Sequence, residues 1–100
     1  MRADESARTD RRTVSVRVTG RVQGVGFRWW TQGEAEAAGL AGFVRNETDG
    51  SVHALLSGPG HAVDAMLERL HTGPAGARVE TVEVREANVA DVPGGFEVRR

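Results

Sequence analysis

The first hydrophobic pattern along the chain is a strict alternation that begins near Thr13. Valine occupies every second position, and polar residues separate the three valines, Val14, Val16 and Val18. A period of two is typical of a strand that buries one face. The alternation therefore predicts a first strand that runs into Gly20.

Two later segments have the features of helices. Residues 27–38 follow a glycine-containing loop and are rich in alanine, although Gly33 weakens a helix there by roughly 1 kcal/mol. In the segment after Gly60, apolar side chains recur at positions i, i+3, i+4 and i+7, which are Val63, Met66, Leu67 and Leu70. This spacing places all four on one face and predicts an amphipathic helix that ends at Gly73 and Pro74.

Shorter apolar runs predict the remaining strands, and turn residues separate them. The runs cover residues 42–46, 51–57, 79–84 and 96–98. Asp49 and Gly50 lie between the first two runs and are typical of a hairpin turn. The phase of the alternation slips near Glu80, which indicates a bulge in the third run.

The predicted order of elements is β-α-β-β-α-β, followed by a short C-terminal strand. This order indicates an α+β fold, the ferredoxin-like α/β sandwich, in which two helices cover one face of an antiparallel sheet. Residues 1–12 are almost wholly polar, and we interpret them as a disordered N-terminal extension of a single domain at residues 13–100. Such a fold serves enzymes, RNA-binding proteins and regulatory domains, so function has to be argued from a site.

The composition removes several kinds of chemistry. The thirteen basic residues are all arginine, and with fourteen acidic residues they leave a formal charge of -1. The absence of lysine excludes a Schiff base and a P-loop, and the absence of cysteine excludes disulfides and a thiolate nucleophile. We find neither a secretory signal nor an apolar stretch of about 18 residues. We therefore expect a soluble, cytoplasmic monomer that binds neither nucleic acid nor a membrane.

A loop with two glycines connects the first strand to the first helix. Glycine at positions 24 and 26 lets successive backbone N–H groups point into one concavity, and the N-terminus of the helix adds its unpaired amides. Arg28, in the first helical turn, could hold two oxygens of a bound anion. The alternative is a tight turn followed by an ordinary surface arginine, and the glycine pattern alone favours that alternative.

A second segment favours the anion-binding interpretation of the loop, because Arg45 and Asn46 end a predicted strand just before the Asp49-Gly50 turn. The two segments together resemble the acylphosphatase family. Residues 20–28 resemble its phosphate-binding signature, residues 39–52 resemble its second signature, and residues 96–98 are similar to its last strand. The resemblance extends over about residues 13–99. Phe43 stands where the family often has tryptophan, which leaves the substrate preference open.

The resemblance implies a metal-free, cofactor-free hydrolase of small acyl phosphates, which releases inorganic phosphate and is inhibited by it. Arg28 would bind the phosphoryl group, and Asn46 would position the attacking water. The backbone amides of one loop would form the phosphate cradle, and its residues are Gln23, Gly24, Val25, Gly26, Phe27 and Arg28. An acyl phosphate expels a carboxylate whose conjugate acid has a pKa of about 4, so no proton donor is needed. A neutral amide is then sufficient to orient a water molecule.

We interpret the histidines, the two tryptophans and Arg45 as residues with a structural or surface role. The histidines lack metal-ligand spacing, and we interpret His53, His61 and His71 as solvated surface residues. Trp29 and Trp30 point about 100° apart on a helix, so at least one should pack in the core, while the other could lie at the site mouth or on the surface. Arg45 should point to the sheet face opposite to that of Asn46 and form an ion pair.

Three other functions remain as alternatives. An RNA-binding domain would require exposed aromatic residues on its central strands, and these strands offer few. A phosphate-sensing domain should retain Arg28 and lose Asn46, whereas both are present. A module of a larger carbamoyl-transfer enzyme is disfavoured because the chain ends at Arg100.

Overall fold

The computed structural model describes residues 11–100, and most of the predicted N-terminal extension lies outside this range. The first strand, β1, spans Arg11–Arg21 and so begins two residues before the predicted boundary at Thr13. Arg11 and Arg12 extend the pairing with the strand β3, opposite Pro59 and Gly58. The guanidinium of Arg12 also donates to Asp64 at 2.6 Å and to Glu86 at 2.8 Å. These contacts explain why two charged residues belong to the sheet.

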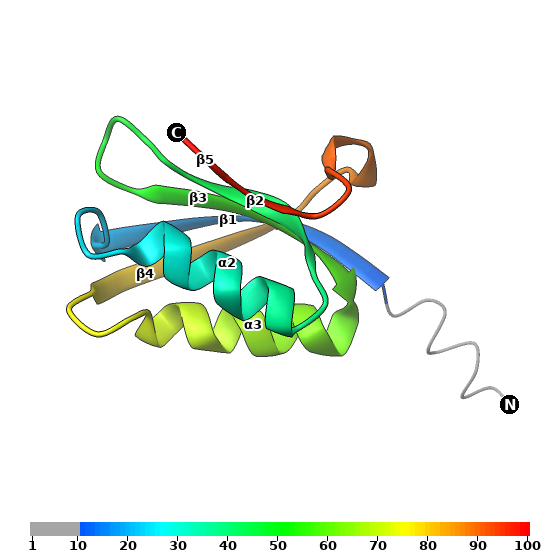
Figure 1. The fold of residues 1–100 in the computed structure, drawn as a ribbon, viewed down its shortest axis with the longest axis horizontal. Coiled ribbons are helices and arrows are strands. Elements are labelled where there is room, and N and C mark those ends of the chain that lie inside the picture. Colours follow the sequence, from blue (N-terminus) through cyan, green and yellow to red (C-terminus); the bar gives the residue numbers. More distant parts are fainter. Residues whose placement is uncertain (1–10) are drawn as a thin grey trace, which may run out of the picture.

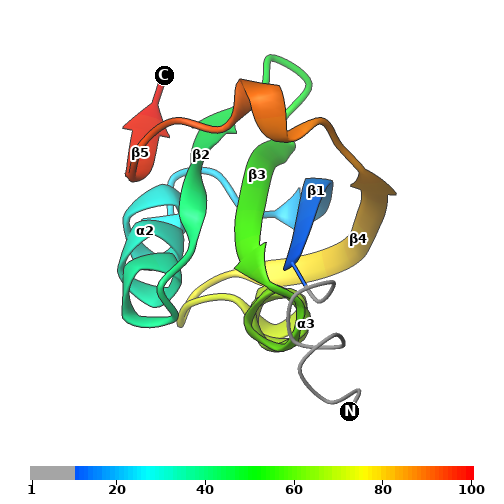
Figure 2. The same cartoon turned by 90° about the vertical axis from the view of Figure 1, so that its right-hand side faces the viewer.

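Two helices cover one face of a five-stranded sheet whose order is β4-β1-β3-β2-β5 (Figures 1 and 2). The helices are α2 (Phe27–Ala37) and α3 (Gly60–Thr72). The strands after β1 are β2 (Ala41–Asn46), β3 (Val52–Pro59), β4 (Arg78–Glu86) and β5 (Phe96–Arg99). This architecture confirms the ferredoxin-like sandwich and the predicted order of its elements.

The direction of the last strand corrects the expectation of an antiparallel sheet. β5 pairs with β2 in parallel, from Gly42 opposite Phe96 to Arg45 opposite Arg99, so the sheet is mixed. Residues 87–95, which include the short 3-10 helix η1 (Val89–Asp91), lead from β4 at one edge of the sheet to β5 at the other (Figure 2). The chain re-enters the sheet at the same end of the sheet at which β4 ends. β5 must therefore run opposite to β4, which is the direction of β2.

The core lies between the sheet and the two helices. The alternating valines of β1 are fully buried against it, as are Val44 of β2 and Leu56 of β3. From the helices, Phe27, Val63, Met66 and Leu70 meet these side chains. The predicted bulge is confirmed, because the pairing of β1 with β4 steps from Thr81 to Val79 and leaves Glu80 without an opposite residue. This core holds the β1–α2 loop and the end of β2 in place.

Candidate active site

The loop between β1 and α2 contains two left-handed glycines, separated by Val25. Gly24 has φ 77° and Gly26, which caps the start of α2, has φ 76°. A Cβ atom at either position would meet no protein atom within 4 Å. The backbone angle, and not a lack of space, therefore requires glycine here. Left-handed residues in such a loop turn their amides toward one concavity.

The start of α2 is left without a side-chain cap. No side chain of residues 11–100 accepts a hydrogen bond at this cap, and the first turn carries no acidic residue. The first amides of a helix lack intrahelical partners, and the helix dipole makes this end positive. The N-terminus of α2 can therefore bind an anion from the loop side.

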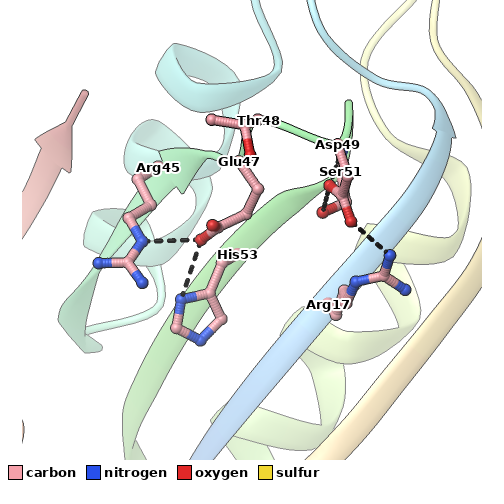
Figure 3. A pocket seen from close by; sticks show the side chains of 7 residues that line it. All are labelled: Arg17, Arg45, Glu47, Thr48, Asp49, Ser51 and His53. Carbon is pink, nitrogen blue, oxygen red and sulfur yellow. Dashed lines mark hydrogen bonds and ion pairs between the residues drawn. The ribbon is translucent and has the colours of Figure 1, made fainter.

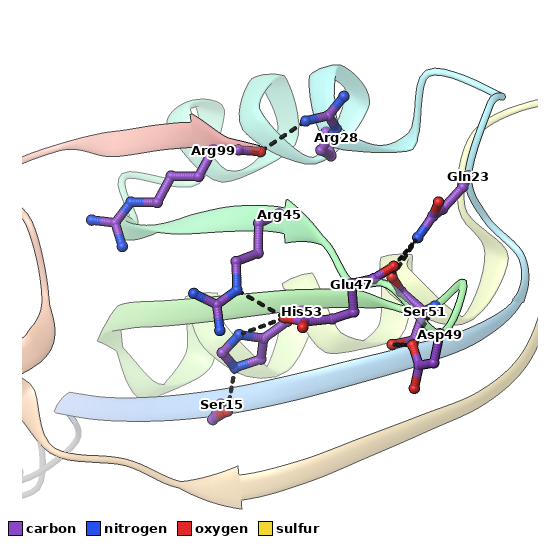
Figure 4. A network of polar contacts seen from close by, with 9 residues as sticks. All are labelled: Ser15, Gln23, Arg28, Arg45, Glu47, Asp49, Ser51, His53 and Arg99. Carbon is purple, nitrogen blue, oxygen red and sulfur yellow. Dashed lines mark hydrogen bonds and ion pairs between the residues drawn. The ribbon is translucent and has the colours of Figure 1, made fainter.

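Arg28 lies in the first turn of α2 and is half-buried between that helix and β5. Its Nη1 donates a hydrogen bond to the backbone carbonyl of Arg99 at 2.8 Å (Figure 4). The parallel β5 strand thus holds the guanidinium in place through its main chain. Gln32, one turn later, makes a longer contact to the carbonyl of Phe96 at 3.3 Å.

Asn46 is the last residue of β2 and shares a sheet face with the buried Val44. Arg45 points to the opposite face, where its Nε donates to Glu47 at 2.8 Å, so both predictions for Arg45 are confirmed. Asn46 and Arg28 line one hollow of about 160 Å³. The complete lining consists of Val22, Gly24, Gly26, Phe27, Arg28, Trp29 and Asn46.

Two residues of the predicted cradle do not line this hollow. Val25 is partly buried and packs against the core. The side chain of Gln23 turns away from the helix, and its Nε2 donates to the carbonyls of Glu47 at 2.8 Å and Ser51 at 2.9 Å (Figure 4). Both hydrogens of the Gln23 amide are therefore used to attach the loop to the turn that follows Asn46.

A family model described as Acylphosphatase matches residues 14–98. The chain belongs to the acylphosphatase family. The residues of the two signatures had indicated this family, and the match confirms that prediction.

Curated relatives and solved structures agree with the assignment. The acylphosphatase of Rhizobium meliloti is 56% identical over 91 residues, which cover 91% of this chain and 96% of that protein. The acylphosphatase structure from Coxiella burnetii has a TM-score of 0.86 at 33% identity and covers 93% of this chain and 97% of that one. The structure from Bacillus subtilis has a TM-score of 0.83 at 35% identity and covers 88% and 98%, respectively. No helix among residues 11–100 is long and apolar enough to cross a membrane.

The two tryptophans of this acylphosphatase-family chain have different surroundings. Trp30 packs against the core, and its ring meets that of Phe27 edge-on at 5.5 Å between centroids. Trp29 is 66% exposed and lies at the hollow beside Arg28 and Asn46. The prediction that one would pack in the core is confirmed, and the other lies at the site mouth.

A larger hollow, of about 360 Å³, lies on the sheet face without helices (Figure 3). It is lined by Arg17, Arg45, Glu47, Thr48, Asp49, Ser51 and His53. Its two arginines have acidic partners, Asp49 at 2.7 Å from Arg17 and Glu47 at 2.8 Å from Arg45. The positive charges of this larger hollow are therefore compensated inside it. The smaller hollow at α2 contains an arginine without a carboxylate among its lining residues.

His53 is not the solvated residue that the sequence predicted. One ring nitrogen, Nε2, forms a hydrogen bond of 2.8 Å with the hydroxyl of Ser15 (Figure 4). The other, Nδ1, is buried without a hydrogen-bond partner among the described residues. Burial lowers the pKa of His53 and the charge of Arg45 lowers it further, whereas Glu47, 3.8 Å from Nδ1, acts against them. The contact between Arg45 and Glu47 could have been found from the sequence, because Glu47 directly follows β2 and residues two apart in an extended chain share a face.

Proposed function

We propose that this acylphosphatase-family chain hydrolyses small acyl phosphates in the hollow at the start of α2, with Arg28 and Asn46 as its catalytic residues. One observation carries the proposal. The hollow unites an arginine, an amide side chain, two left-handed glycines and the uncapped end of a helix. Hydrolysis of the bond between carboxyl and phosphate is the activity of the family to which the chain belongs.

The phosphoryl group binds to the backbone amides of residues 23–28 and to the guanidinium of Arg28. The amides donate hydrogen bonds without moving, because the glycine angles and the helix hold them in place. Arg28 adds a full positive charge and planar donors that fit two phosphoryl oxygens. Its contact with the Arg99 carbonyl uses Nη1 and leaves other N–H groups for the phosphate.

Asn46 orients the water that attacks phosphorus. Its carbonyl oxygen accepts a hydrogen bond from the water, and its NH2 group donates to an oxygen of the phosphate. As the new bond from the water oxygen to phosphorus forms, the bond to the carboxylate oxygen breaks and its electron pair leaves with the carboxylate. One proton of the water moves to a phosphoryl oxygen, so the products are a carboxylate and dihydrogen phosphate.

The weakness of the broken bond explains why this small site is sufficient. The leaving carboxylate has a conjugate acid with a pKa of about 4, so it departs without a proton donor. The transition state is loose, and positioning and charge stabilisation supply most of the catalysis. The reaction therefore needs neither a metal ion nor a cofactor, and a chelator should leave the turnover of benzoyl phosphate unchanged.

The proposal extends to the partners of the protein. Inorganic phosphate, as the product, competes with the substrate for the cradle. We further propose that nucleic acid is not a partner, because Arg17 and Arg45 on the helix-free face are paired with carboxylates and the formal charge is -1. We also propose a monomer, since the lining of the hollow needs no residue from a second chain, and a cytoplasmic location.

Replacement of the two side chains tests the assignment. We expect Arg28→Ala and Asn46→Ala to reduce kcat for benzoyl phosphate by a factor of about 10²–10³ each, which is typical of one lost preorganised donor. Arg69→Ala, which removes an arginine of α3, and Asn88→Ala, which removes the cap of η1, are matched controls and should retain activity. Wild-type rates in Arg28→Ala or Asn46→Ala would refute the roles assigned here.

A further inference from the structure

Trp29 is the large apolar side chain at the mouth of the hollow, and the mechanism above gives it no task. It is 66% exposed, whereas the neighbouring Trp30 packs against Phe27 and the core. An isolated exposed apolar residue is ordinary on a protein surface. Trp29 differs from such a residue because it lines the same hollow as Arg28 and Asn46.

The hollow is smaller than the pockets that enclose drug-sized ligands. Its volume of about 160 Å³ is well below the roughly 300–1,000 Å³ of pockets that enclose drug-sized ligands. The groups that can hold phosphate line this hollow, so we take the phosphoryl group to fill it and the acyl group to extend toward the rim. The acyl group therefore meets whatever apolar surface the rim offers.

Trp29 supplies that surface. The other apolar side chains of the lining, Val22 and Phe27, are only 1% and 2% exposed, because they belong to the core. Their exposed area is too small to bind an acyl group. Trp29 presents most of its indole to solvent, and an aromatic face binds another ring in an offset or edge-on arrangement.

We propose that Trp29 is the acyl-binding residue of this site and that the chain consequently prefers acyl phosphates with an aromatic or extended apolar acyl group to acetyl phosphate. The inference rests on the proposed function, because it takes the phosphate to occupy the hollow. The contact lies away from the bonds that form and break. It is therefore made in the ground state and in the transition state alike, and it lowers KM while leaving kcat unchanged.

Two substrates of different acyl size test the inference. For benzoyl phosphate, we expect Trp29→Ala to raise KM about tenfold, the size of one well-packed aromatic contact, and Trp29→Phe to recover most of the loss. For acetyl phosphate, KM should stay within about twofold, since its methyl group offers little area to the indole. The matched control is Val89→Ala, which removes another exposed apolar side chain, 67% exposed, outside the hollow.

Each other outcome has a definite meaning. An equal change of KM for both substrates would overturn the inference, since Trp29 would then act on the phosphate end, and so would an unchanged KM for benzoyl phosphate. The ratio of the inhibition constants of phenylphosphonate and methylphosphonate measures binding of the acyl group without turnover. Trp29→Ala should abolish any preference for the phenyl compound. If the wild type binds both phosphonates but cleaves neither acyl phosphate, the proposed function fails while the inference about Trp29 is still decided by this ratio.

Discussion

Gln23 attaches the β1–α2 loop to the turn that follows Asn46, and its replacement tests whether this attachment matters. The Nε2 atom donates to two backbone carbonyls, at 2.8 Å from Glu47 and 2.9 Å from Ser51. We choose Gln23→Met because methionine keeps the length of the side chain and removes both donors. The half-buried carbonyls of Glu47 and Ser51 would then lose a partner each.

The magnitude follows from the two hydrogen bonds. A typical intramolecular hydrogen bond contributes about 0.5–1.5 kcal/mol net, so we expect the free energy of unfolding to fall by about 1–3 kcal/mol. For a domain of this size, each 1 kcal/mol corresponds to a shift of Tm of roughly 4–8 °C. The loss is smaller where water reaches the freed carbonyls.

Activity should fall by more than stability explains. Gln23 joins the loop that holds the phosphate in the proposed mechanism to the strand end that carries Asn46, so without it the attacking water and the phosphorus would be less well aligned. Misalignment of reacting groups lowers kcat, and we expect a decrease of about 10-fold or more at a temperature at which the variant is fully folded. Gln23→Glu should be worse at neutral pH, because a carboxylate would face two carbonyl oxygens.

The assay combines urea unfolding with steady-state kinetics on benzoyl phosphate. Gln32→Met is the matched control, because Gln32 is the other glutamine of the chain and makes a single longer contact of 3.3 Å. It should have the smaller effect on both measurements. If Gln23→Met unfolds at the wild-type urea concentration and keeps the wild-type kcat, the attachment has no role in the site.

Two further predictions concern the backbone of the loop and the helix-free face. Gly26→Ala should lower the free energy of unfolding in urea by roughly 1–2 kcal/mol, because residue 26 has a left-handed backbone. Gly33→Ala should raise it by up to about 1 kcal/mol, because Gly33 lies inside α2 and an added Cβ would have free space. Equal effects of the two substitutions would refute the backbone argument. The lowered pKa of His53 means that its contribution to stability is present above about pH 6.5 and is lost as the pH falls through the folded-state value. The free energy of unfolding should therefore decrease less between pH 7.5 and pH 5 in His53→Gln than in the wild type, and an identical decrease would contradict this.

The elements of the fold could be predicted because their patterns are local. The alternating valines of β1 and the 3-4 spacing in α3 each depend on which side of one element faces the core. The phase slip at Glu80 marked the bulge for the same reason. These interpretations required no knowledge of the neighbouring elements.

The arrangement of the site depended on partners that are distant along the chain. Gln23 binds two main-chain carbonyls, and Arg28 binds the main chain of Arg99, 71 residues away. A backbone carbonyl exists at every residue, so no residue type identifies such a partner. The prediction for His53 was wrong because its neighbours lie outside its own strand, namely Ser15 of β1, Phe43 of β2 and Glu47.

The sequence by itself determined the elements, the two glycines, and the presence of Arg28 and Asn46 at the ends of a loop and a strand. The tertiary structure alone decided the direction of β5, the attachment of the loop through Gln23 and the position of Trp29 at the rim. The physical reason is the range of the forces. Backbone angles and face patterns are set within a few residues, whereas strand neighbours and side-chain partners result from how the whole sheet and its helices pack together.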